Sequence, residues 1–156
     1  METITAMGNF LSFLGELMED TRMNIPDLAE KLNCDEAAIR RWTYKLYFPD
    51  SKTLIKVSET FNISADYMFG FSDFKEFHKN KSSLTFYQRY LKLKTSYKEK
   101  LSDYTVAKNC KLRQSTITKW KNGNTIPETE TLLNLAEFFD CSMDYLLGQS
   151  ESENRL

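Results

Sequence analysis

An internal repeat constrains the fold of this chain more than any other feature. A shift of 78 positions lays the first half on the second, and the matches need no gap from residue 24 to residue 70. The shared positions are those that a buried core or a helix end would restrict, so chance is a poor explanation. They are Ala29 with Ala107, Ile39 with Ile117, Trp42 with Trp120, Pro49 with Pro127, Leu54 with Leu132, Phe61 with Phe139, Asp66-Tyr67 with Asp144-Tyr145, and Gly70 with Gly148. The chain therefore predicts two copies of one structural unit.

Each copy has the pattern of five short helices. In the first copy, apolar residues recur at helical spacing over roughly 9–21 and in four later segments. The expected N-caps of those four segments are Asn24, Asp35, Asp50 and Ser64, and we expect the last helix to end at Gly70 in the left-handed conformation. The predicted fold class is all-α, with two tandem five-helix domains.

The predicted boundaries are a first domain at 1–70, a linker at 71–84, a second domain at 85–150 and a polar tail at 151–156. Three phenylalanines of the linker, Phe71, Phe74 and Phe77, fall at helical spacing. They are expected either to pack as a helical turn on one domain or to cover a seam between copies or between chains. The tail is expected to be frayed.

Composition argues against several classes of protein. The 156 residues contain no apolar run near the roughly 20 residues of a membrane span, and the N-terminus lacks a basic leader. Cys34, Cys110 and Cys141 are odd in number and widely spaced, which is typical of reduced thiols used as apolar filler. His78 is the sole histidine. We therefore expect a cytoplasmic protein that is not an enzyme and uses no metal or cofactor.

Charge divides unevenly along the chain. The net charge is −1, but residues 1–80 carry nine basic and thirteen acidic side chains, a net −4. Residues 81–156 carry twelve basic and nine acidic side chains, a net +3. The second half is therefore better suited to approach nucleic acid.

The stretch SDYTVAKNCKLRQSTITKWKNG, residues 102–123, predicts a capped helix, a tight turn and a second helix that stops at Asn122-Gly123. The inner side of the first helix is expected to carry Tyr104, Val106, Ala107 and Cys110. Ile117 and Trp120 mark one face of the second helix. The opposite face has hydrogen-bonding groups rather than generic charge, a surface that suits the edges of base pairs; it carries Gln114, Ser115, Thr118 and Lys119.

Both copies resemble the Cro and lambda-repressor (XRE) helix-turn-helix family. The resemblance rests on an inner Ala in the second helix, Ile-x-x-Trp in the third, Lys-Asn-Gly, Pro, Leu-Leu-x-Leu-Ala and Asp-Tyr-Leu-Leu-Gly, all present in the second copy. It implies that the third helix of the domain enters the major groove of double-stranded DNA. Base contacts then fall to Gln114, Ser115, Thr118 and Lys119, and phosphate contacts to Thr116, Asn122, Lys111 and Arg113.

Two positions depart from the family pattern. The first residue of the second helix, often an amide that holds phosphate, is Asp103. The glycine that is usual in the turn is Lys111 in the second copy and Asn33 in the first. Asparagine tolerates the left-handed conformation, whereas lysine adopts it only with strain.

The first copy leaves two interpretations open. Its corresponding face shows Glu36, Ala37, Arg40 and Arg41, in which arginines suit DNA but the acidic residues oppose it. The segment TYKLYFP replaces KNGNTIP and is expected to expose Tyr44, Tyr47 or Phe48. The first copy is thus either a second DNA reader or a docking or dimerising domain.

The predicted function is a sequence-specific DNA-binding transcription regulator, a repressor of bacterial or phage type. A monomer should prefer an asymmetric site, whereas a homodimer should prefer a palindrome. The alternative is a protein-interaction module, such as an antitoxin or a phage-encoded inhibitor, whose first copy holds a protein partner.

Overall fold

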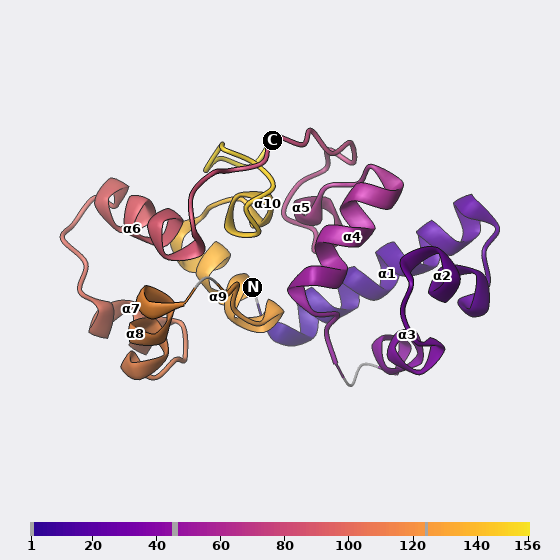
Figure 1. Ribbon diagram of the computed structural model, residues 1–156, viewed down its shortest axis with the longest axis horizontal. Helices are drawn as coiled ribbons and strands as arrows, with labels where there is room; N and C mark the ends of the chain where they lie inside the picture. The colour runs from indigo at the N-terminus through magenta and orange to yellow at the C-terminus, as the bar shows by residue number, and fades with distance from the viewer. Residues whose placement is uncertain (1, 45–46, 124) are drawn as a thin grey trace. The chain divides into compact units, whose positions relative to one another are not determined.

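The computed structural model describes residues 2–44, 47–123 and 125–156, and over these residues the fold is all-α. The chain forms two compact units, residues 1–78 and 79–155, and the described part of each contains five helices (Figure 1). The first unit contains α1 (Thr3–Thr21), α2 (Ile25–Leu32), α3 (Glu36–Thr43), α4 (Ser51–Phe61) and α5 (Ala65–Met68). The second contains α6 (Phe86–Ser96), α7 (Asp103–Asn109), α8 (Gln114–Asn122), α9 (Thr129–Phe139) and α10 (Met143–Leu146).

Local sequence signals set most helix ends. Asn24 and Asp27 form a reciprocal capping box at the start of α2, and the Asp50 side chain accepts from the Thr53 N–H at 2.7 Å. Ser64 caps α5 in the same way. Asp35 stands at the N-cap of α3 but makes no side-chain cap hydrogen bond. Helix α1 begins at Thr3 rather than near residue 9, because the buried residues Ala6 and Met7 extend its apolar stripe.

Each unit has its own aromatic core. In the first unit, Phe10 of α1 is fully buried and its ring lies edge-on to Trp42 at 6.0 Å. In the second, Phe86 of α6 lies edge-on to Trp120 at 5.1 Å. The same kind of aromatic contact thus joins α1 to α3 in the first unit and α6 to α8 in the second.

The segments that follow α5 and α10 fold back onto their own units. Ser64 N–H donates to the Lys75 carbonyl at 2.9 Å, and Ser142 N–H donates to the Glu153 carbonyl at 2.9 Å. These two pairs are related by the 78-residue shift, so the repeat continues from residue 70 to residue 75. We call residues 71–77 and 149–155 the return segments.

The return segments correct the predicted helical turn in residues 71–84 and the predicted frayed tail. Residues 71–84 contain no helical turn: Phe77 is buried, whereas Phe74 is 66% exposed. The division between units at residue 78 also splits the predicted linker. The tail is packed rather than frayed, because Arg155 donates to the carbonyls of Ala136 and Cys141, each at 2.9 Å.

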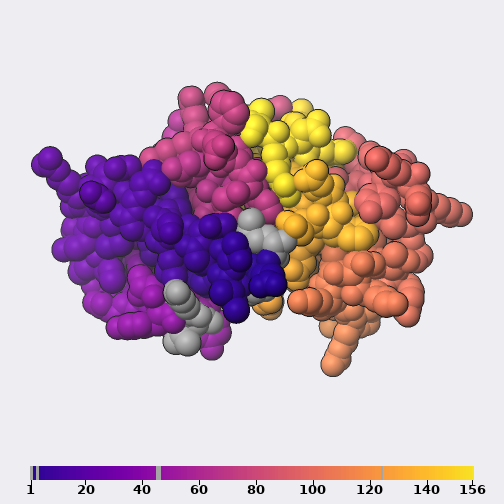
Figure 2. Space-filling model, turned by 180° about the vertical axis from the view of Figure 1, so that it is seen from behind, coloured from indigo at the N-terminus to yellow at the C-terminus, as the bar shows by residue number. Residues whose placement is uncertain are grey.

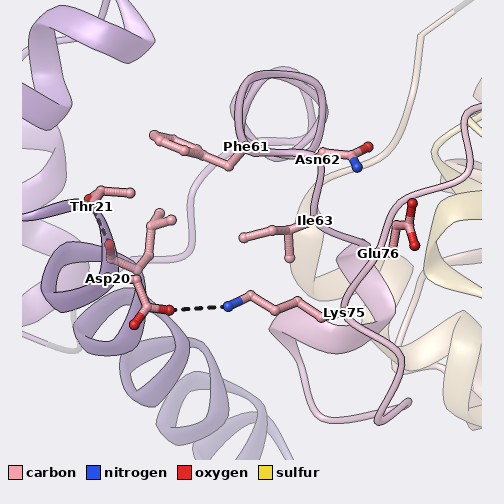
Figure 3. Close-up of a pocket in the computed structure, with 8 residues that line it drawn as sticks. Asp20, Thr21, Phe61, Asn62, Ile63, Lys75 and Glu76 are labelled. Atoms are coloured by element: carbon pink, nitrogen blue, oxygen red, sulfur yellow. Dashed lines mark hydrogen bonds and ion pairs between the residues drawn. The ribbon is translucent and has the colours of Figure 1, made fainter.

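The first return segment lines one side of an open pocket of about 380 Å³ between the ends of α1 and α4. Figure 3 shows the ammonium group of Lys75 reaching the carboxylate of Asp20, at 3.2 Å. Lys75 also pairs with Glu16 at 2.9 Å, and hydrogen bonds from Lys75 and Tyr67 lower the pKa of Glu16. The lysine therefore ties the segment to α1.

Candidate nucleic-acid interface

The α7–turn–α8 element of the second unit has the predicted geometry. Ser102 caps α7 by accepting from the Thr105 N–H at 3.1 Å. In the turn, Leu112 N–H donates to the Ala107 carbonyl at 2.8 Å, and Lys111 adopts a left-handed conformation with φ of 57°. The Asn134 side chain of α9 donates to the Cys110 carbonyl at 3.4 Å, which holds the turn against the core.

Buried side chains fix the rotation of α7 and α8. Val106 and Ala107 are buried on α7 and Cys110 is buried at its C-cap, where burial raises the pKa of the Cys110 thiol to about 12. Tyr104, predicted on the inner side, is instead 62% exposed. At 100° per residue Tyr104 falls about 60° beyond Ala107, outside the stripe that Val106, Ala107 and Cys110 form, so its ring faces solvent.

Ile117 and Trp120 bury the inner face of α8, so the opposite face must point outward. The predicted residues Gln114, Ser115, Thr118, Lys119 and Asn122 are all exposed, and Thr116 is half-buried. Lys111 and Arg113 are exposed on the turn that leads into the helix. Figure 2 shows the surface of α7 and α8 in orange, with side chains projecting from it.

The outer face of α8 and its turn is strongly basic. Residues 108–122 contain five basic side chains and no acidic one: Lys108, Lys111, Arg113, Lys119 and Lys121. The corresponding stretch of the first unit, residues 30–44, contains three basic and three acidic side chains. Of the two units, the second therefore offers the more favourable surface to a polyanion.

Asp103 has a structural task that its sequence position did not reveal. Its carboxylate accepts from Lys94 at 2.6 Å and from the Tyr90 hydroxyl at 2.7 Å, tying α7 to α6. Burial works to raise the pKa of Asp103, but the hydrogen bonds from Lys94 and Tyr90 outweigh it and lower the pKa. The negative charge of Asp103 is thus partly neutralised by Lys94 within the second unit.

The Asp103 tie should make the second unit sensitive to acid. Because the folded-state pKa lies below the usual value of about 3.9, the stabilisation is complete above that value and disappears as pH falls through the folded pKa. We expect Asp103→Asn to lower the free energy of unfolding by about 1 kcal/mol at pH 7. The difference from wild type should shrink toward pH 3 in denaturant titrations. An equal difference at both pH values would contradict an ionic tie.

Lys111 should carry measurable backbone strain. A non-glycine residue in the left-handed region is strained by about 1–2 kcal/mol, and a glycine there relieves this strain. Glycine also loses more conformational entropy on folding, which offsets about 0.5–1 kcal/mol of the gain. We expect Lys111→Gly to stabilise the second unit by about 0.5–1 kcal/mol in denaturant unfolding. Asn33→Gly is the matched control at φ of 50° and should gain less, because asparagine tolerates this region. A destabilised Lys111→Gly variant would show that the lysine side chain supports the turn.

Helix α3 holds the equivalent position in the first unit. Its inner residues Ile39 and Trp42 are buried, while its outer face is exposed and carries Glu36, Ala37, Arg40 and Arg41. Within the described residues, no ion pair joins these charged side chains to another group. The face therefore keeps its charges available.

The aromatic residues that follow α3 differ in exposure. Tyr44 is 71% exposed and Tyr47 is 62% exposed. Phe48, by contrast, is half-buried and its ring lies 6.1 Å from that of Phe69. Residues 45 and 46 of the predicted interface segment lie outside the described residues. The candidate surface is thus centred on the two tyrosines.

In the described part of the chain, no three His, Cys, Asp or Glu side chains are grouped so as to hold a metal ion. Over the same residues, no helix has both the length and the apolarity needed to cross a bilayer.

Comparison with known proteins identifies one region. The helix-turn-helix family model matches residues 96–146, from the end of α6 to the end of α10. No curated protein and no solved structure matches the chain. The match supports an XRE-type helix-turn-helix in the second unit, a domain type associated with DNA-binding transcription regulators.

Proposed function

We propose that this chain is a cytoplasmic, sequence-specific regulator of transcription, a repressor that reads the major groove of double-stranded DNA with α8. The observation that carries the proposal is the outer face of α8, which is exposed, basic and free of acidic residues, on a helix fixed by Ile117 and Trp120. This face lies within the region matched by the helix-turn-helix family model.

The side chains on this face suit direct readout of bases. Gln114 at the first position of α8 can pair with the N6 and N7 edge of adenine, and Lys119 can donate to guanine. Ser115 and Thr118 carry hydroxyls that serve either base type, although the Thr118 hydroxyl donates to the Gln114 carbonyl at 3.3 Å in the free protein. The Thr118 side chain must therefore rotate for its hydroxyl to reach a base.

The remaining predicted residues suit the sugar–phosphate backbone. Lys111 and Arg113 lie on the turn before α8, Thr116 lies within the helix and Asn122 lies at its end. Contacts of this kind position the protein without selecting a sequence. Each lysine or arginine contact should release about one counterion, which makes binding depend on salt concentration.

Binding-site selection with the purified protein tests the proposal. We expect a preferred DNA motif from wild type, and a loss of about 10- to 100-fold in affinity for it from Gln114→Ala or Lys119→Ala, with relaxed preference at one position each. Lys52→Ala, at an exposed position of α4 in the first unit, is the control and should change neither affinity nor motif.

The phosphate contacts have a different signature. Lys111→Ala and Arg113→Ala should weaken binding to all sequences alike and reduce the salt slope by about 1 each. The absence of any preferred motif, or a preference untouched by Gln114→Ala and Lys119→Ala, would refute reading by α8. A reporter gene whose promoter overlaps the selected site distinguishes repression from activation.

A second candidate function belongs to the first unit. The exposed Tyr44 and Tyr47 and the mixed charge of α3 favour a protein contact over a second DNA contact, because Asp35 and Glu36 stand where the second unit has Arg113 and Gln114.

A further inference from the structure

The charges on the outer face of α3 are separated along the helix axis. Glu36 lies in the first turn, next to the N-cap Asp35, whereas Arg40 and Arg41 lie in the last turn. At 1.5 Å per residue, Glu36 and Arg41 are about 7.5 Å apart along the axis. The face is thus negative at one end and positive at the other.

The charges on this face are complementary to those on the same face of a second copy whose α3 runs in the opposite direction. In an antiparallel pair of helices related by a two-fold axis, Glu36 of one copy lies opposite Arg41 of the other, and the reverse contact forms at the same time. Ala37 then lies opposite Arg40, and its small side chain lets the two helices approach closely. A parallel pair would instead bring like charges together.

The surroundings of α3 support the same arrangement. Tyr44 and Tyr47 follow the positive end of the helix in the sequence and are 71% and 62% exposed, so their rings are accessible to add apolar area to a contact made by α3. Two antiparallel helices also place each positive helix N-terminus near the negative C-terminus of the other.

We propose that the outer face of α3 is a contact between two copies of this chain, formed as an antiparallel α3–α3′ pair and flanked by Tyr44 and Tyr47. The contact is small, because one short helix and two rings per copy supply it, so the dimer is weak. Its ion pairs are exposed, so salt weakens it.

Sedimentation of the full chain without DNA tests the contact independently of DNA binding. We expect a concentration-dependent monomer–dimer equilibrium in 0.05 M salt that shifts toward monomer in 0.5 M salt. Glu36→Arg should weaken the dimer by at least about tenfold, because the two-fold axis introduces the like-charge contact twice. Glu19→Arg, at an exposed position of α1, changes the net charge equally and should leave the equilibrium unchanged.

Charge swapping makes the test specific. Arg40→Glu combined with Arg41→Glu should also give monomers, yet an equimolar mixture with Glu36→Arg should form a heterodimer, which shows that both variants are folded. All three substitutions in one chain should restore the homodimer, because the reversed face is again self-complementary.

Three results would overturn the proposal. One is a wild-type chain that stays monomeric at 100 µM in low salt. Another is an equilibrium that Glu19→Arg shifts as much as Glu36→Arg does. The third is a loss of DNA affinity on reversing Arg40 and Arg41 at concentrations where the wild type is monomeric, which would make α3 a DNA-contacting helix instead.

Discussion

Replacing Trp120 by alanine should lower the free energy of unfolding of the second unit by about 3–5 kcal/mol and abolish the DNA binding that we propose for α8. Trp120 is 5% exposed, and its ring lies edge-on to Phe86 at 5.1 Å and to Tyr90 at 5.4 Å. Removing the indole leaves a cavity between α6 and α8. Because small domains have only about 5–15 kcal/mol of stability, the loss is a large share of the total.

Each unit contains one tryptophan, so the unfolding of each unit can be followed by the fluorescence of its own tryptophan. In the Trp120→Ala variant, fluorescence of Trp42 should follow an unchanged denaturation of the first unit, while far-ultraviolet circular dichroism should show early loss of the helices of the second. Coincident loss of both signals would contradict independent unfolding of the two units.

Trp42→Ala is the matched control. Trp42 is 4% exposed and lies against Phe10, so the substitution should cost the first unit a similar free energy. It should leave the Trp120 transition in place and preserve binding to a single DNA half-site. If both variants lost half-site binding equally, α8 would not be the sole helix that contacts the half-site.

Replacing Gly148 by alanine should cost the second unit about 3 kcal/mol. Gly148 has φ of +76°, where any other residue is strained, and a Cβ atom there would lie 3.1 Å from three guanidinium atoms of Arg89. That guanidinium is buried and donates to the carbonyls of Leu84 and Leu146. It cannot move aside without breaking these bonds.

Gly70 offers the matched comparison in the first unit. Its φ is +78°, and a Cβ atom would lie 2.6 Å from the Asn9 amide nitrogen. That amide is the end of a side chain and can turn away by giving up interactions that include its 2.9 Å bond to the Phe69 carbonyl, so we expect Gly70→Ala to cost about 2 kcal/mol.

Both glycine substitutions can be followed by fluorescence when the tryptophan of the other unit is replaced by phenylalanine. Gly148→Ala is read from Trp120 in a Trp42→Phe background, and Gly70→Ala from Trp42 in a Trp120→Phe background. A smaller cost at Gly148 than at Gly70 would show that Arg89 is freely displaced.

Features that depend on neighbours in the sequence could be predicted from it. The caps at Asn24, Asp50 and Ser64 join a side chain to a backbone N–H only two or three residues away, so the residue type at one position is enough. The inward face of α8 followed from the three-residue spacing of Ile117 and Trp120.

Features that depend on partners far away in the sequence could not be predicted from it. The spacing of the phenylalanines in residues 71–77 is helical, yet the segment is not a helix, because the Lys75 carbonyl accepts from Ser64 and the Lys75 side chain pairs with α1. Asp103 likewise departs from the family pattern for a reason found in α6, where Lys94 and Tyr90 hold its carboxylate. Neither partner is marked by local spacing.

The return segments have a consequence for how such a chain can be lengthened or divided. Because each copy supplies its own closing segment, a fragment that stops at Gly70 would lose the carbonyl that accepts from Ser64 and the buried ring of Phe77. A fragment that stops at residue 78 keeps both. Duplication at a period of 78 residues therefore adds a complete module each time. If the proposed function is correct, a hybrid chain with two second units should bind a doubled DNA site.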